Sequence, residues 1–295
     1  MDTETKESYR KAGKIAAEAL AYGKSLIKKG ELVVDVCDKI EAKIKELGGE
    51  PAFPAQISLN ETAAHYCPDK DDDLVFGDDV VCLDVGAHVD GYIGDNACSI
   101  DLSGKNEKLI EASQKALEEA EKILKVGIKV CEIGKVIEET IKSYGFEPVR
   151  NLSGHGLDQH NVHTKPTIPN FDNGDETRLE KGMAFAIEPF ATTGNGLIEE
   201  KGLPNVYSLF GKKSVRLPAI RKIMLELEKL DGMPFTRRWL YSKFTPAQVK
   251  MALMQFKQLD ILKDYPPLVE RTNGLVSQAE NSFIVDEKIE KITKI

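Results

Sequence analysis

The sequence predicts a mixed α/β (α+β) fold made of two duplicated halves, with a helical segment inserted into the second half. Three observations support this expectation: pairs of amphipathic helices precede strand-like segments, one helix-pair sequence is repeated, and a helix-rich block interrupts the later strands. The 295 residues allow one large domain or two ordinary ones, and 41% hydrophobic with 30% charged residues is typical of a globular protein.

A pair of helices opens the chain. Apolar residues recur at helical spacing over 8–29 and 36–47, and Gly30 and Gly48-Gly49 end these helices. The same sequence returns 97 residues later without a gap, with ten identities in 24 positions that include glycines and a closing Glu-x-Pro. We interpret this as an internal duplication, whose halves would pack around a pseudo-two-fold axis with a shared cleft. The matched positions are Lys28/Lys125, Gly30/Gly127, Val33/Val130, Ile40/Ile137, Glu41/Glu138, Ile44/Ile141, Lys45/Lys142, Gly48/Gly145, Glu50/Glu147 and Pro51/Pro148.

Strand-like segments follow each helix pair. Apolar residues dominate 80–85, a second strand is expected over 92–102, and Asp90-Gly91 between them is typical of a two-residue hairpin turn. Residues 183–187 and 276–285 also predict strands.

The block over residues 205–266 predicts a small helical insertion. Residues 220–230 are amphipathic, and Thr245-Pro246-Ala247-Gln248 is a helix start with proline at the first position and a capping-box glutamine. The main domain would then comprise residues 1–204 and 267–295.

Charge and composition argue against several classes of protein. The formal net charge of -8 does not favour a nucleic-acid-binding protein, which needs a clustered basic face. No run approaches 18 apolar residues, and the polar N-terminus lacks the apolar core of a signal peptide, so no membrane association is expected. Five scattered cysteines indicate free thiols in a reducing compartment, the cytoplasm. They are Cys37, Cys67, Cys82, Cys98 and Cys131.

The predicted hairpin carries two acids on one face. With Asp90-Gly91 as its turn, Asp95 lies opposite Gly86, and Asp84 is one diagonal step away on the same side. Two such charges, at least half buried, would repel each other and lose hydration, so a cation is expected between them. The alternative is an exposed hairpin face with two solvated acids.

Two further acids lie in apolar runs, and one histidine lies between glycines. Glu188 follows Ala-Phe-Ala-Ile, and Glu280 lies within 276–285. A single buried glutamate more often pairs with Lys or Arg, but acids in three strand segments are harder to explain that way. Gly154 and Gly156 flank His155 and would let the backbone approach a ligand closely.

Together these residues predict a dinuclear metal site. Four carboxylates match the charge of two divalent cations, and oxygen-rich ligation with one nitrogen suits Co, Mn, Fe or Zn. A structural zinc site would favour Cys and His. The candidate ligands are Asp84, Asp95, His155, Glu188 and Glu280.

This order of Asp, Asp, His, Glu and Glu resembles the methionine aminopeptidase and prolidase family, whose fold is called pita-bread. The resemblance covers nearly the whole chain. The helical block in the 92 residues that separate Glu188 from Glu280 is similar to type 2 members, and the compact N-terminus is similar to archaeal ones. The supporting motifs are Pro51-Ala52-Phe53-Pro54, Ala63-Ala64-His65-Tyr66, Asp84-Val85-Gly86-Ala87-His88, Asn151-Leu152-Ser153-Gly154-His155 and Ile187-Glu188-Pro189-Phe190.

The resemblance implies an enzyme that removes the N-terminal methionine of nascent proteins when the second residue is small, through a water activated by two metal ions. Asp84 would bind one metal, and Asp95 and Glu280 would bridge both. His155 and Glu188 would bind the other metal, and Glu188 would also act as general acid and base.

The family's remaining site residues also have counterparts. His65 and His163 match the histidines that contact the scissile peptide, and Phe53, Val162 and Tyr265 match the walls of the methionine pocket. The resemblance implies a monomer whose partner is the N-terminal methionine of nascent chains. Proximity to the ribosome stays open.

Some residues depart from the family pattern. Cys82 stands where Lys is usual, and Ala279 and Asn281 flank Glu280 where Phe and His are usual. They are neighbours of ligands, so they would change metal affinity at most. His88 and His160 are expected to be structural or surface residues.

Two alternatives remain. A prolidase or Xaa-Pro aminopeptidase of the same fold would carry an extra N-terminal domain, whereas here the duplicated sequence starts close to Met1. A non-enzymatic binding protein on this fold would have lost metal ligands, whereas all five are present.

Overall fold

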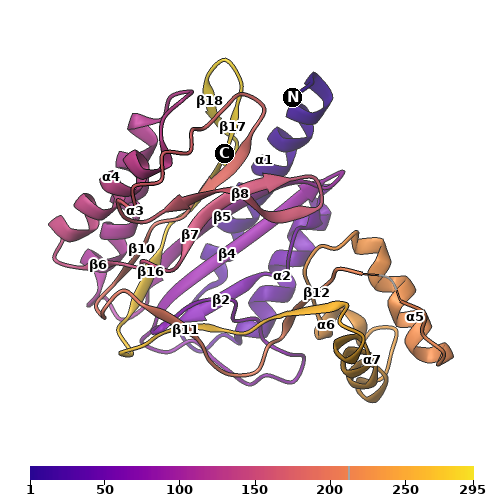
Figure 1. Ribbon diagram of the computed structural model, residues 1–295. Coiled ribbons are helices and arrows are strands. Elements are labelled where there is room, and N and C mark those ends of the chain that lie inside the picture. The colour runs from indigo at the N-terminus through magenta and orange to yellow at the C-terminus, as the bar shows by residue number, and fades with distance from the viewer. Residues whose placement is uncertain (212) are drawn as a thin grey trace.

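The computed structural model describes residues 1–211 and 213–295, in which two helix pairs pack against antiparallel sheets and a third group of helices forms a separate lobe (Figure 1). Helix α1 packs on β4 and β5, and helices α3 and α4 pack on strands of the second half. The helices are α1 Thr3–Leu26, α2 Val33–Glu46, α3 Glu107–Ile123, α4 Val130–Ser143, α5 Pro218–Leu227, the 3₁₀ helix η1 Glu228–Leu230, α6 Arg237–Leu240 and α7 Pro246–Gln258.

Within residues 1–211 and 213–295, the strands form five small sheets. Those of the first half are β1 Glu50–Pro51, β2 Gln56–Leu59, β3 Thr62–Ala64, β4 Val80–Val89 and β5 Tyr92–Asp101. Those after the second helix pair are β6 Glu147–Pro148, β7 Ser153–Asp158, β8 Asn161–Pro169, β9 Ala184–Ile187, β10 Phe190–Thr192 and β11 Ile198–Glu200. The remaining strands are β12 Val206–Leu209, β13 Phe235–Thr236, β14 Leu262–Tyr265, β15 Leu268–Glu270, β16 Val276–Gln278, β17 Asn281–Val285 and β18 Ile289–Lys291.

The repeated sequence folds in the same way in both halves. Helices α2 and α4 have the same length and begin 97 residues apart, as do the two-residue strands β1 and β6. Gly48 and Gly145 both have φ of 86°, a left-handed conformation that favours glycine at a helix end. Each half has its own hydrophobic core, one between α1, α2 and the β4 sheet and one between α3, α4 and the strands of the second half.

The hairpin register also agrees with the prediction. Strands β4 and β5 pair with Gly86 opposite Asp95, and the turn residues Asp90 and Gly91 both have positive φ. Two-residue hairpin turns of this kind match the twist of the strands. The first strand continues beyond its predicted range of 80–85, to Val89, and the second covers all but the last residue of its predicted range.

The strand expected over 276–285 is broken. It divides into β16 and β17 around Ala279 and Glu280, because the backbone turns there to hydrogen-bond with other strands. The N–H of Ala279 donates to Pro189 O, and the N–H of Glu280 donates to Ala97 O. Pro189 likewise separates β9 from β10.

The inserted lobe contains strands as well as the expected helices. Helix α7 begins after the capping box of Thr245 and Gln248, as predicted. Strands β12, β13 and β14 were not expected from the sequence, and they form a sheet in which Val206 pairs with Tyr265. The lobe has its own hydrophobic cluster, drawn from residues between 207 and 262. Within the described part of the chain, no helix combines the length and apolar character that crossing a bilayer requires.

Candidate dinuclear metal site and substrate pocket

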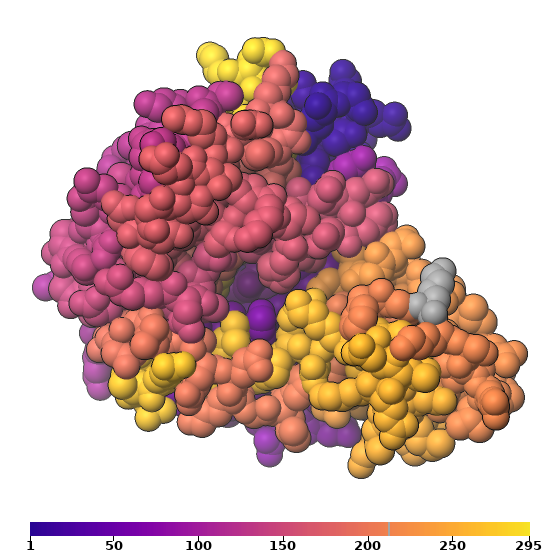
Figure 2. Space-filling view, in the orientation of Figure 1, coloured from indigo at the N-terminus to yellow at the C-terminus, as the bar shows by residue number. Residues whose placement is uncertain are grey.

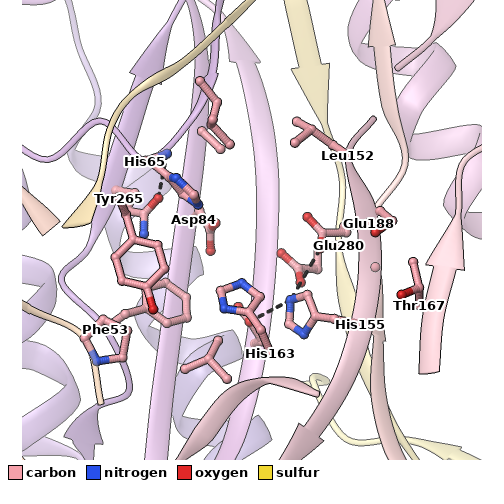
Figure 3. A pocket seen from close by; sticks show the side chains of 18 of the residues that line it. Phe53, His65, Asp84, Leu152, His155, His163, Thr167, Glu188, Tyr265 and Glu280 are labelled. Carbon is pink, nitrogen blue, oxygen red and sulfur yellow. Dashed lines mark hydrogen bonds and ion pairs between the residues drawn. The ribbon is translucent and has the colours of Figure 1, made fainter. Parts of the chain in front are cut away.

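One cavity of about 620 Å³ brings together all ten candidate site residues. Figure 2 shows it as a hollow where magenta, orange and yellow parts of the chain meet. In Figure 3, Glu188, Glu280 and His155 lie on one side, Phe53 and Tyr265 on the other, and His163 between them. The ten candidates among its lining residues are Phe53, His65, Asp84, Asp95, His155, Val162, His163, Glu188, Tyr265 and Glu280.

Strand geometry places the four carboxylates. Asp84 and Asp95 come from the adjacent strands β4 and β5, and Glu188 and Glu280 come from the breaks that end β9 and β16. Strand breaks and bulges commonly re-aim a side chain toward a site. Asp84 and Glu188 hold equivalent places in the two halves, because each lies three residues before the partner of the repeated proline, Ala87 or Ala191.

The imidazole of His155 lies beside the carboxylates. Its Nε2 is 3.3 Å from Glu188 Oε1 and 3.9 Å from Asp95 Oδ2. One potential ligand atom from each of Asp95, His155 and Glu280 lies within 4.8 Å of the other two. Such spacing lets a single cation contact several of these groups.

Burial and mutual repulsion perturb the four acids. Without a cation, burial raises the pKa of Asp84 to about 7. Burial, followed by the charge of Asp84, raises the pKa of Asp95 well above its ordinary value. Burial and neighbouring carboxylates likewise raise the pKa values of Glu188 and Glu280. Four acids in this state favour either protons or cations as neutralising partners.

The donor atoms of the site fit divalent cations. Asp84 Oδ1, Asp95 Oδ1 and Glu280 Oε1 are buried and have no hydrogen-bond partner among the described residues. Among those residues, the ion pairs of these acids involve His155 and no lysine or arginine. Buried polar atoms nearly always have a hydrogen-bond partner. A cluster of buried carboxylate oxygens without such partners is therefore suited to binding a metal ion.

Two more histidines face the cavity. His65 Nδ1 is 3.3 Å from the carbonyl oxygen of Pro266, and burial lowers its pKa to about 4. The ring of His163 lies 4.5 Å from that of His155, and burial lowers the pKa of His163 well below its ordinary value. Both rings are therefore neutral at pH 7, with one N–H donor and one acceptor each.

Apolar walls close the rest of the cavity. Phe53 and Val162 are 5% exposed and belong to a hydrophobic cluster shared by both halves and the lobe. Tyr265 lies edge-on to His65, with ring centroids 5.7 Å apart. Gly86 makes room for Phe53, because a Cβ at Gly86 would lie 2.3 Å from that ring.

The glycines beside His155 lie where the neighbouring strands pack closely. A Cβ on Gly154 would lie 2.3 Å from Ala186 O, and a Cβ on Gly156 would lie 2.2 Å from Lys165 O. These glycines let neighbouring strands approach, so they fix His155 through the sheet.

The residues that depart from the family pattern make contacts of their own with other parts of the chain. Ala279 belongs to the core of the second half, and Asn281 donates to Glu121 Oε1 at 2.7 Å. The Cys82 thiol is buried and donates to Val276 O at 3.4 Å. His88 and His160 contact each other, with ring centroids 6.1 Å apart, and do not line the cavity.

Two glutamines near the acids were missed. Gln278 is 1% exposed, and its Nε2 donates to Glu280 Oε2 at 3.4 Å. Its spacing of two from Glu280 along the chain could have placed it on the same face. Gln56 lines the cavity and accepts a hydrogen bond from the backbone N–H of His65. Nothing in the local sequence indicates that Gln56 and His65 are in contact.

Comparison with known proteins agrees with this architecture. The profile of metallopeptidase family M24 matches residues 7–219. A methionine aminopeptidase of Methanocaldococcus jannaschii is 41% identical over 295 residues, with 99% of each chain covered.

Two solved structures share the fold. A thermophilic Arx1 superposes with a TM-score of 0.86 at 16% identity, covering 99% of this chain and 91% of its own. A methionine aminopeptidase from Thermotoga maritima gives 0.73 at 24% identity, covering 100% and 98%. Since the profile and the archaeal relative both extend across most of the sequence, the chain belongs to metallopeptidase family M24.

Proposed function

We propose that this protein is a methionine aminopeptidase that removes the initiator methionine from newly made chains with a small second residue. The observation that carries the proposal is a cluster of two buried acids, two half-buried acids and one imidazole beside an apolar-walled cavity. The archaeal relative named methionine aminopeptidase supports it over nearly the full length.

Two divalent cations are the cofactors of this proposal. Asp84 would hold one and His155 and Glu188 the other, with Asp95 and Glu280 shared. When bound, such a pair supplies Lewis acidity and lowers the pKa of a water toward neutrality. The three partnerless carboxylate oxygens support this assignment.

Glu188 is the proposed proton carrier. Its side chain is 12% exposed, so it keeps access to the cavity, and its raised pKa suits a group that takes and returns a proton. It would accept the proton of the attacking water and deliver it to the leaving nitrogen.

The two neutral histidines have different proposed tasks. Since Pro266 O can only accept, His65 carries its proton on Nδ1 and offers Nε2 as an acceptor, which suits the N–H of the scissile peptide. His163 would donate to the developing oxyanion. A donor aimed at that oxygen is typically worth about 3 kcal/mol in the transition state.

The methionine side chain would lie against Phe53, Val162 and Tyr265. A thioether adapts well to aromatic and aliphatic walls. Since one chain lines the whole cavity, we propose that the protein acts as a monomer. The five free cysteines support a cytoplasmic location, where nascent chains and a nearby ribosome are available.

We also propose that residues 205–266 are an insertion subdomain on a catalytic domain of 1–204 and 267–295. The separate hydrophobic cluster and the pairing of Val206 with Tyr265 support these boundaries.

The decisive experiment combines elemental analysis of gently purified protein with two peptide assays. Release of methionine from Met-Gly-Met, with divalent metal bound and no cleavage of an Xaa-Pro peptide, is the expected result. Cleavage of the Xaa-Pro peptide alone would favour a prolidase-type enzyme. A protein that binds metal but releases no amino acid from either peptide would overturn the proposal.

A further inference from the structure

His65 has an unusual backbone conformation. Its φ is 65°, in the left-handed region, and it directly follows the end of β3. A non-glycine residue held there costs on the order of 1–3 kcal/mol and persists only where its surroundings fix it. The contacts that fix His65 therefore decide where its ring lies.

Two hydrogen bonds hold this residue. The backbone N–H of His65 donates to Gln56 Oε1 at 2.8 Å, and the ring Nδ1 lies 3.3 Å from Pro266 O. One contact fixes the main chain and the other fixes the ring. The pair sets both the position and the orientation of the imidazole.

Gln56 is well placed for this task. It is 6% exposed, it begins β2, and it lies directly opposite Asp84 in the β2–β4 pair. The same side chain lines the cavity. Through Gln56, the strand that pairs with the Asp84 strand also sets the place of His65.

We propose that Gln56 is a positioning residue that holds His65 in register with the metal site. The inference rests on the proposed function, because it assigns His65 to the scissile peptide. Loss of the acceptor leaves a backbone N–H without its partner and frees a strained residue, so the His65 ring would move out of line.

The test is a double-mutant cycle on methionine release from Met-Gly-Met. Gln56→Met keeps the length of the side chain but removes the acceptor. We expect kcat to fall about 10–100-fold, the loss typical of an outer-shell partner, with metal content and inhibition by free methionine unchanged. In the His65→Ala protein, Gln56→Met should lower kcat by less than about a further twofold, because the imidazole that Gln56 positions is absent.

Ser58→Ala is the matched control. Ser58 lies in the same strand, is 1% exposed and does not line the cavity, so its loss should leave kcat unchanged. Equal losses from Gln56→Met with and without His65 would overturn the positioning role. Loss of metal from Gln56→Met would also overturn it and assign Gln56 to the metal site instead. If His65→Ala left kcat unchanged, that result would refute the role proposed for His65 itself, separately from the role of Gln56.

Discussion

Asp95 is a buried carboxyl group that lacks a neutralising partner within the described part of the chain. It is 3% exposed, its Oδ1 has no partner among the described residues, and burial together with Asp84 raises its pKa. A group in this state stabilises the fold only when a cation or proton neutralises it.

Asp95→Asn should therefore have opposite effects on activity and stability. Loss of a shared ligand should lower metal content and reduce turnover more than about 100-fold, beyond the loss typical of an outer-shell partner. The metal-free variant should melt at a higher temperature than metal-free wild type near pH 8, because it no longer buries an ionisable carboxyl group beside other carboxyl groups. Elemental analysis, peptide assay and calorimetry measure the three quantities. Full activity in this variant would refute the two-metal assignment.

The role proposed for His163 separates catalysis from metal binding. Its ring packs on His155, and burial lowers its pKa, so the ring is neutral. A neutral imidazole still has one N–H that can donate to an oxyanion. His163→Ala should lower kcat about 10²–10³-fold with metal content unchanged. A variant that loses metal as well as activity would identify His163 as part of the metal site.

Among the elements of the fold, two equivalent glutamates of the duplicated helices make different contacts. Glu41 and Glu138 are equivalent positions in α2 and α4. Glu138 is a partly exposed residue that pairs with Lys142 at 2.7 Å. Glu41 is 6% exposed and pairs with Arg238 of the inserted lobe, at 2.8 Å between Oε1 and Nη2. It also accepts from the indole of Trp239 and the N–H of Ala55. The lobe is thus tied to the first half by a buried ion pair.

Arg238→Met should destabilise the protein by about 3–5 kcal/mol, because Glu41 is left buried without its cation. Lys142→Met is the matched control, since it breaks the equivalent exposed pair and should cost about 0–1 kcal/mol. Urea unfolding of both variants in metal-loaded protein measures the difference. Equal small losses would mean that the lobe is not held by this pair.

The sequence predicts elements well where local signals agree. The repeated glycines, the capping box at Thr245 and the Asp90-Gly91 turn specify their own geometry, and the structure follows them. The break at Glu280 was missed because it depends on hydrogen bonds to Ala97 and Pro189, which lie far away in the chain. Gln56 and the strands of the lobe were missed because they too depend on contacts that the local sequence does not indicate.

At the scale of the molecule, the candidate ligands join the two halves. Asp84 and Asp95 belong to the first half, and His155, Glu188 and Glu280 belong to the second. Repulsion between the carboxylates of the two halves destabilises the metal-free fold. Cations bound between these carboxylates would attract both halves. Metal binding and global stability are therefore linked.

This linkage predicts a pH dependence with a definite sign. The pKa of Asp84 rises from 3.8 to about 7 on folding without metal, so between these values the folded state keeps a proton that the unfolded state releases. Its contribution to stability is present at acid pH and is lost as the pH rises through about 7. Cations must displace that proton, so they bind more tightly above pH 7. We expect the gain in melting temperature on adding Mn²⁺ to grow from about pH 5.5 to about pH 8. Asp84→Asn should flatten this trend, and a gain that shrinks with rising pH in wild type would contradict the linkage.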